Sequence, residues 1–118
     1  MRDDSGFQFF QLRPANVTDV VVFTAVVRTV ITNIYIANTT ASDARARIFH
    51  DDDGTVLSTD TAIAYDILVA ANTTVVFIAT QSPGGIFVSP GGTIGIGSNT
   101  GNALNFTGYG VRQRRSKL

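Results

Sequence analysis

Apolar and polar residues alternate along most of this chain, with the two-residue period of β-strands. The alternation is clearest over residues 28–38. There it predicts core-facing side chains at Val30, Ile34 and Ile36, and outward side chains at Thr29, Asn33 and Tyr35. The predicted strands number about eight and span residues 7–12, 17–25, 28–38, 44–50, 62–68, 73–80, 93–98 and 103–112. Short strands at this spacing are typical of a β-sandwich or a β-barrel.

Residues 44–50 repeat the pattern with charge on one side. The predicted buried residues are Ala44, Ala46 and Ile48, and those of the opposite face are Arg45, Arg47 and Phe49. Turn-forming residues separate the strands, as at Asp53-Gly54, because glycine accepts a positive φ. The sequence Ser-Pro-Gly-Gly occurs at 82–85 and again at 89–92. We expect residues 86–88 between the two copies to form a loop or a short edge strand.

Composition strengthens the β interpretation. All nine acidic residues are Asp and lysine occurs once, so the residues that usually cover exposed helix faces are scarce. At 118 residues the chain has the length of one domain. We therefore predict an all-β fold over 1–118, an antiparallel β-sandwich of about eight strands that is jelly-roll-like. Extended arms are expected at both ends, over residues 1–10 and in a basic tail over 112–118.

The charge balance argues against partners that are bound mainly through their charge. Formal net charge is zero, so neither nucleic acid nor a membrane surface is an expected partner. Asp19 and Arg28 interrupt one apolar run, and Asp66 and Asn72 interrupt another, so we expect no membrane span. The first residues do not resemble a signal peptide. There is no cysteine, and hence no disulfide framework.

Catalytic patterns are equally scarce. His50 is the single histidine, and no serine lies in a Gly-x-Ser-x-Gly pattern, so we predict that the protein is not an enzyme. Asp51, Asp52 and Asp53 precede Gly54 and are expected to form a solvated turn, with weak cation binding as the open alternative. The glycines around residues 92–101 match no phosphate-binding pattern. We expect no cofactor and no metal site.

Several stretches resemble the small β-sandwich virion proteins of tailed bacteriophages. They are Arg-Thr-Val-Ile-Thr-Asn-Ile-Tyr-Ile-Ala-Asn-Thr-Thr at 28–40, Ala-Arg-Ile-Phe-His-Asp-Asp-Asp-Gly at 46–54, Ala-Ala-Asn-Thr-Thr at 70–74 and Ala-Leu-Asn-Phe-Thr-Gly-Tyr-Gly-Val at 103–111. Members of that family often have a Pro-Ala-Gly turn before the Arg-Thr pair, where this chain has Ala25-Val26-Val27. The resemblance spans about residues 11–111 and implies a structural subunit of a virion.

The resemblance implies a capsid cement, or decoration, protein that binds the outer capsid surface and stabilises the shell, assembled in the host bacterial cytoplasm. Its expected partners are further copies of itself, as a homotrimer, and the major capsid protein. The candidate contact residues are Phe7, Phe9, Phe10, Arg112, Arg114 and Arg115. Two simpler interpretations stay open: the phenylalanines form a first strand packed in their own core, and the arginines form a solvated tail.

Two other functions remain open. One is a structural subunit of the tail, baseplate or fibre, which the number of copies in each particle would distinguish. The other is a carbohydrate-binding module for host surface recognition, in which Tyr35, Tyr65 or Tyr109 stacks on sugar rings.

Overall fold

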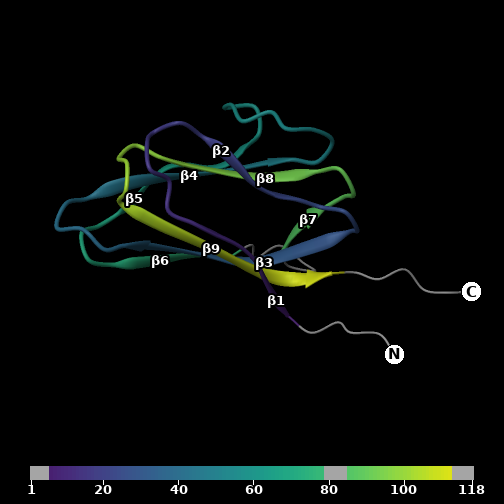
Figure 1. The fold of residues 1–118 in the computed structure, drawn as a ribbon, viewed down its shortest axis with the longest axis horizontal. Helices are drawn as coiled ribbons and strands as arrows, with labels where there is room; N and C mark the ends of the chain where they lie inside the picture. The colour runs from purple at the N-terminus through teal and green to yellow at the C-terminus, as the bar shows by residue number, and fades with distance from the viewer. Residues whose placement is uncertain (1–5, 79–84, 113–118) are drawn as a thin grey trace, which may run out of the picture.

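The computed structural model describes residues 6–78 and 85–112, and these residues form nine strands and two sheets. The strands are β1 (Phe7–Leu12), β2 (Val20–Thr24), β3 (Thr29–Asn38), β4 (Ala44–Asp51), β5 (Ala62–Val69), β6 (Thr74–Ile78), β7 (Ile86–Val88), β8 (Thr93–Ser98) and β9 (Leu104–Arg112). Figure 1 shows the two sheets stacked face to face. The predicted all-β sandwich is confirmed.

The strand order is that of a jelly roll. One sheet, here called sheet A, has the order β1-β9-β3-β6, with β7 also paired to β3; sheet B has the order β2-β8-β4-β5. Every pairing is antiparallel, and early strands pair with late ones, β1 with β9 and β2 with β8. With β7 set aside, this is the eight-strand, two-sheet jelly-roll arrangement. The short β7 is the edge strand that the paired Ser-Pro-Gly-Gly turns indicated.

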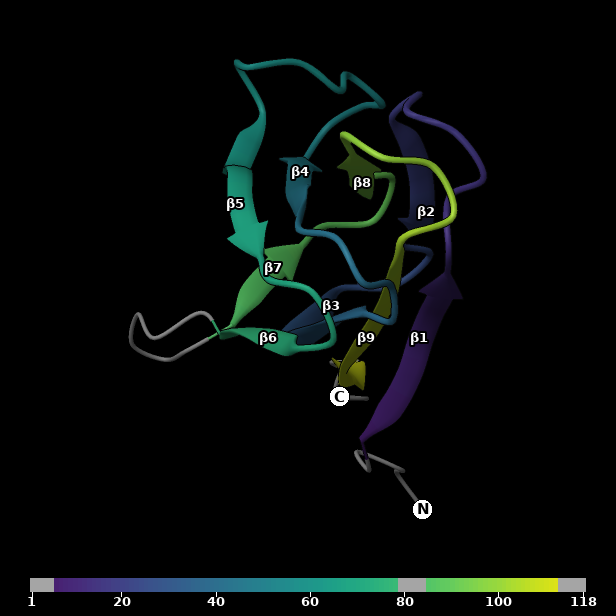
Figure 2. The same ribbon diagram turned by 90° about the vertical axis from the view of Figure 1, so that its left-hand side faces the viewer.

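Strand order determines which edges of the sandwich lie together. β1 ends sheet A and β2 ends sheet B, and Figure 2 shows these two strands on the same side of the molecule, with β5 and β6 on the opposite side. Residues from the beginning of the chain therefore form one flank of the domain. The end of β9 lies at this flank too, because Phe7 pairs with Gly110.

The core lies between the sheets and consists mainly of isoleucine and small residues. Sheet A contributes Ile34, Ile36 and Phe106, and sheet B contributes Ile48, Ile94 and Ile96, among others. All six are fully buried. Burial of branched side chains from both inner faces is the main stabilising contribution in such a sandwich.

A bulge in β3 changes the predicted alternation. The pairing with β9 shifts register between Ile31 and Asn33, so one extra residue lies in β3. As a result Ile31 joins the central core with Ile34 and Ile36, whereas Val30 is buried outside that core. Val30 is therefore buried as predicted, although outside the cluster that contains Ile34 and Ile36, whereas the prediction of Thr29 as an outward residue is wrong. Thr29 is buried, and its hydroxyl donates to the backbone oxygen of Val27 at 2.9 Å.

In β4 the predicted alternation holds. Ala44, Ala46 and Ile48 are buried in the core, while Arg45 is exposed and Arg47 half-buried on the other face. Phe49 lies on the same side of β4 as the arginines but is fully buried. Its partner in β8 is Gly95, over which the side chain of Leu57 lies. The β4–β5 connection thus covers part of the outer side of sheet B.

Candidate functional site

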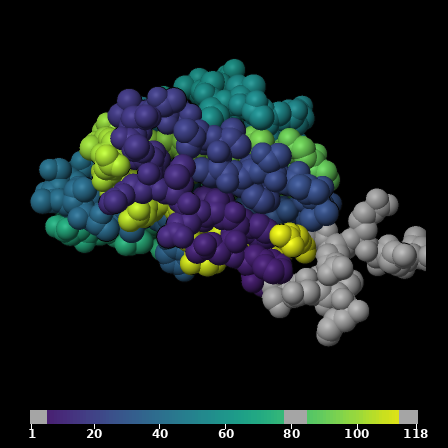
Figure 3. Space-filling view, in the orientation of Figure 1, coloured from purple at the N-terminus to yellow at the C-terminus, as the bar shows by residue number. Residues whose placement is uncertain are grey.

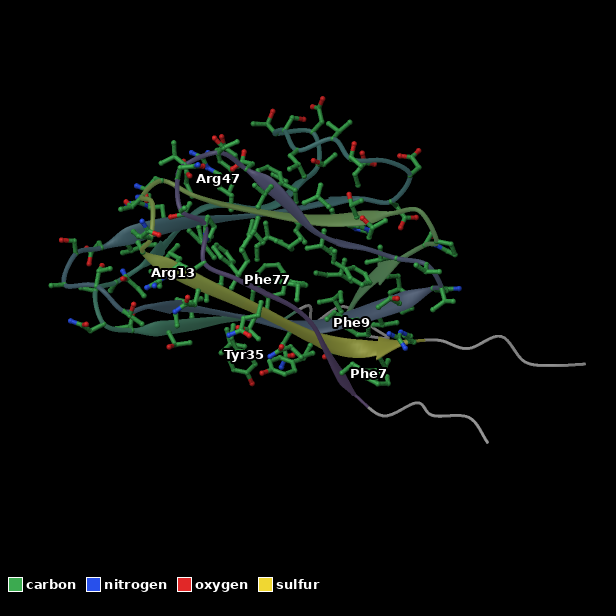
Figure 4. The ribbon with its side chains drawn as sticks, in the orientation of Figure 1. Phe7, Phe9, Arg13, Tyr35, Arg47 and Phe77 are labelled. Atoms are coloured by element: carbon green, nitrogen blue, oxygen red, sulfur yellow. The ribbon has the colours of Figure 1, made fainter. Side chains whose placement is uncertain are left out.

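Aromatic side chains from both edge strands gather at the flank where β9 ends. The rings of Phe7 and Phe9 in β1 lie 5.8 Å apart, and the ring of Phe23 in β2 lies 5.3 Å from that of Phe9. The guanidinium carbon of Arg112 lies 4.9 Å from the centroid of Phe7 and 5.8 Å from that of Phe9. Figure 4 shows Phe7 and Phe9 together at this end of the sheet. A cation over aromatic rings is an attractive arrangement.

A groove lies next to this aromatic group and shares Phe23 and Arg112 with it. It has a volume of about 410 Å³ and is lined by Phe23, Thr24, Val26, Val27, Thr29 and Arg112. Val26 is 86% exposed, the most exposed large apolar side chain of the described residues, and Val27 is also exposed. We call Phe7, Phe9, Phe23, Val26, Val27 and Arg112 together the end surface. Figure 3 shows the purple β1 residues beside the blue residues around the β2–β3 turn on this face.

The sequence-predicted contact residues thus fall into three groups. Phe7, Phe9 and Arg112 meet at the end surface. Phe10 does not: it is 6% exposed, belongs to the central core, and its ring lies against Gly108 of β9, where no side chain stands in its way. Arg114 and Arg115 lie outside the described residues, as do residues 1–5 and the rest of the 113–118 tail.

Residues 7–10 are therefore part of a strand rather than an arm. They begin β1, which pairs with β9 from Phe7 to Leu12. The predicted arm over 1–10 is corrected for this portion, because Phe-Gln-Phe-Phe-Gln-Leu alternates apolar and polar residues on either side of a bulge between Gln8 and Phe10, which suits an edge strand packed against the core. Sequence reasoning did not identify Phe23 as a neighbour of Phe9, nor Val26 and Val27 as neighbours of Arg112 in the groove, since the strand pairing brings them together.

The two edge strands of this flank have no charged residue. β1 reads Phe-Gln-Phe-Phe-Gln-Leu and β2 reads Val-Val-Val-Phe-Thr. Exposed edges in natural proteins are commonly protected by charges, by bulges or by a covering segment. Here each strand has a register shift, between Gln8 and Phe10 and between Val21 and Phe23. Within the described chain these edges therefore have bulges but no charged residue.

The aspartate cluster after β4 organises a loop. The Asp51 carboxylate accepts from the backbone N–H of Val56 at 2.8 Å, and this hydrogen bond is the main cause that lowers the pKa of Asp51. Asp52 accepts from the backbone N–H and from the hydroxyl of Ser89, each at 2.8 Å, and the backbone bond is the main cause that lowers its pKa. A hydrogen bond with the Asp51 carboxyl raises the pKa of Asp53. The cluster therefore connects the β4–β5 loop to the turn before β8.

His50 lies next to this cluster. Its Nε2 is 3.2 Å from the carboxylate of Asp52, and its side chain is half-buried. Over residues 6–78 and 85–112, no group of three or more His or Asp side chains is arranged to hold a metal ion. The described residues also include no helix of the length and apolar character needed to cross a membrane.

The outer face of sheet B has a charged network that the sequence indicated only in part. Arg47 donates from Nε to the carboxylate of Asp66 at 2.7 Å, and Arg45 donates to the backbone oxygen of Asp66 at 3.1 Å. The hydrogen bond to Asp66 is the main cause that raises the pKa of Arg47. Asp66 has a φ of 54° at a bulge in β5, a conformation that Asp tolerates better than most residues. The predicted projection of both arginines on one face is confirmed.

Asp19 completes this network from the segment before β2. Its Oδ1 lies 3.9 Å from Nη1 of Arg47 and packs against Gly97 of β8. Within the described residues this oxygen is buried without a hydrogen-bond partner. Burial raises the pKa of Asp19, more than the neighbouring Arg47 lowers it.

The outer face of sheet A differs, because it has a pair of tyrosines, and the described strands of this sheet include no charged residue other than Arg112. The Arg28 guanidinium, from the turn before β3, lies 5.1 Å from the ring centroid of Phe87 in β7. Tyr35 in β3 and Tyr109 in β9 meet edge to face, with centroids 5.7 Å apart and planes at 87°. Together with Asn33 and Thr107 they line a shallow hollow of about 310 Å³. Tyr65 lies instead in sheet B, where the Arg47 guanidinium carbon is 4.8 Å from its ring centroid. Only two of the three tyrosines named from the sequence therefore come together.

Comparison with known proteins identifies no family for this chain. No protein-family model matches it, and no curated protein matches it. The solved "Structure of infectious bursal disease virus Gx strain" is 15% identical with a TM-score of 0.45, over 93% of this chain and 29% of that chain. The "Structure of infectious bursal disease virus Gt strain" is 15% identical with a TM-score of 0.43, over 93% of this chain and 30% of that chain. This chain thus spans less than a third of either of those chains.

Proposed function

We propose that this protein is a structural, non-enzymatic subunit of a bacteriophage particle, and that it binds neighbouring subunits through the end surface. The observation that carries the proposal is the end surface itself. Aromatic rings from two uncharged edge strands lie there beside exposed valines and one guanidinium. Aromatic and arginine side chains are the residues that most often contribute the binding energy of protein interfaces.

Contact at this surface has a clear energetic basis. Val26 and Val27 are exposed in the isolated chain, and covering apolar area with a partner contributes about 25 cal/mol per Å² before the costs of association. Covering would also exclude water from the Arg112 guanidinium over Phe7 and Phe9, which strengthens a cation–π contact. The edge strands β1 and β2, which have no charge to repel a neighbour, would be protected by the same contact.

In its most specific form, the proposal is that this chain is a capsid cement protein. It binds the outer shell as a homotrimer, with the major capsid protein as its partner, and is assembled in the bacterial cytoplasm. The resemblance of residues 28–40, 46–54, 70–74 and 103–111 to tailed-phage virion proteins supports this choice. Jelly rolls also occur in viral capsid domains, which is an analogy at the level of the fold. A subunit of the tail, baseplate or fibre is the alternative location.

The test is rebinding of purified protein to phage particles that lack it. Val26→Asp places a charge on the end surface at a side chain that is 86% exposed, so folding should be unaffected. Leu68→Asp is the matched control, because Leu68 is 50% exposed on β5, at the opposite edge of sheet B from β2. We expect Val26→Asp to reduce occupancy at least tenfold and Leu68→Asp to bind as the unmodified protein does.

Two results would count against the proposal. If both variants rebind equally well, the end surface is not the contact. If the unmodified protein does not bind particles at any concentration, the virion role itself is wrong. Circular dichroism of each variant before the assay separates loss of contact from loss of fold.

A further inference from the structure

The outer face of sheet A has a feature that the proposed virion role does not use. Tyr35 is 40% exposed and Tyr109 is 38% exposed there, side by side on neighbouring strands. Strand pairing places Tyr35 between Thr107 and Val76, and places Tyr109 between Asn33 and Gln8. The tyrosines are thus surrounded by amide, hydroxyl and methyl groups.

Charge is distributed very unequally between the two sheets. The five strands of sheet A include a single charged residue, Arg112, at the far end of β9. Sheet B has Arg45 and Arg47 in β4 and Asp66 in β5, all directed to its outer side. Figure 4 shows Tyr35 and Arg47 on opposite outer sides of the sandwich. Within the described residues, a ligand at the tyrosines would therefore meet no charged side chain from β3 or β9 other than Arg112.

We infer that Tyr35, Tyr109, Asn33 and Thr107, here called the tyrosine face, form a binding site for a neutral carbohydrate. A pyranose ring has an apolar C–H side that stacks on an aromatic ring, and hydroxyls around its edge that need donors and acceptors. The perpendicular tyrosines offer one ring face and one ring edge. The Asn33 amide and the Thr107 hydroxyl both donate and accept, as a sugar hydroxyl requires.

The size and chemistry of the hollow favour this occupant over a second protein. Its volume of about 310 Å³ lies at the lower end of the range of about 300–1,000 Å³ for small-ligand sites, enough for one or two sugar units. The centre of a protein interface is usually apolar and closely packed. The tyrosine face instead has a polar side chain paired with each tyrosine, Thr107 with Tyr35 and Asn33 with Tyr109. The described strands that carry the tyrosines have no charged side chain near them, which favours a neutral glycan over an anionic one.

The experiment is a titration of the full chain with neutral oligosaccharides of glucose, galactose, mannose and N-acetylglucosamine, and with polygalacturonate as the anionic comparison. Binding is followed by two-dimensional amide NMR and by tyrosine fluorescence, which has no tryptophan background in this chain. Tyr35→Ala and Tyr109→Ala should each weaken binding of a neutral sugar about fivefold, since a stacked aromatic contact contributes about 1 kcal/mol. Tyr109→Phe should retain most of the affinity, because it keeps the ring.

Tyr65→Ala is the matched control, as Tyr65 is a similarly exposed tyrosine on the other sheet. Equal affinity in all the variants would overturn the inference, as would binding of the anionic polymer alone or no binding to any oligosaccharide at millimolar concentration. A change of oligomeric mass in Tyr35→Ala or Tyr109→Ala would identify the face as a protein interface and overturn it as well. None of these outcomes depends on rebinding to particles, so the two proposals fail separately.

Discussion

Substitution of Phe10 by alanine should destabilise the fold far more than the same change at Phe7, although both residues belong to one strand. Phe10 is 6% exposed, lies in the central core and covers Gly108. Removal of a core aromatic side chain usually costs about 3–5 kcal/mol, from lost burial and from the cavity that remains. Phe7 is half-buried and its ring contacts Phe9 and Arg112, so its loss should cost about 1 kcal/mol or less.

Urea unfolding followed by far-ultraviolet circular dichroism measures both values. A domain of this size has a free energy of unfolding of about 5–15 kcal/mol, so Phe10→Ala should remove about a fifth or more of it. Phe7→Ala should move the midpoint only slightly, with the denaturant dependence unchanged. A cost below about 1 kcal/mol for Phe10→Ala, or a larger cost for Phe7→Ala, would refute the assignment of Phe10 to the core and of Phe7 to the surface.

Two further predictions concern the aspartates. Hydrogen bonds from Ser89 hold the pKa of Asp52 below its ordinary value of 3.8, so their contribution to stability is present above that pH and is lost as the pH falls through the folded-state pKa. Asp52→Asn should therefore cost up to about 1 kcal/mol at pH 7, reduced by solvent screening, and progressively less as the pH falls below 3.8; a cost that does not decrease with falling pH would contradict the linkage. Gly97→Ala should cost about 1–3 kcal/mol because its methyl group collides with the Asp19 carboxylate. In an Asp19→Ala background, Gly97→Ala should lower the free energy of unfolding by a smaller amount, measured by denaturation. An equal loss in both backgrounds would exclude that collision.

The fold class followed from the sequence because period-two alternation and turn residues are local signals. The order of the strands did not, since it depends on pairings such as Phe7 with Gly110 that join opposite ends of the chain. The bulge in β3 was not predicted either: one extra residue between Ile31 and Asn33 reverses the inward direction, so that Ile31 and not Val30 joins the cluster with Ile34 and Ile36.

The candidate sites show the same division between local and distant information. Phe7, Phe9 and Arg112 could be named from their residue types, but their contact with Phe23 arises only because β1 and β2 form one flank. In the same way, no spacing in the sequence indicates that Tyr35 and Tyr109 meet edge to face. Residue type predicted which side chains are suited to binding, and the pairing of strands determined which of them lie together.

The most direct test of the central claim is the number of copies of this protein in each purified virion, measured by quantitative mass spectrometry against the major capsid protein. The cement proposal predicts a ratio close to one, and a ratio of a few per cent would move the protein to the tail, baseplate or fibre. Absence from purified virions would contradict the account.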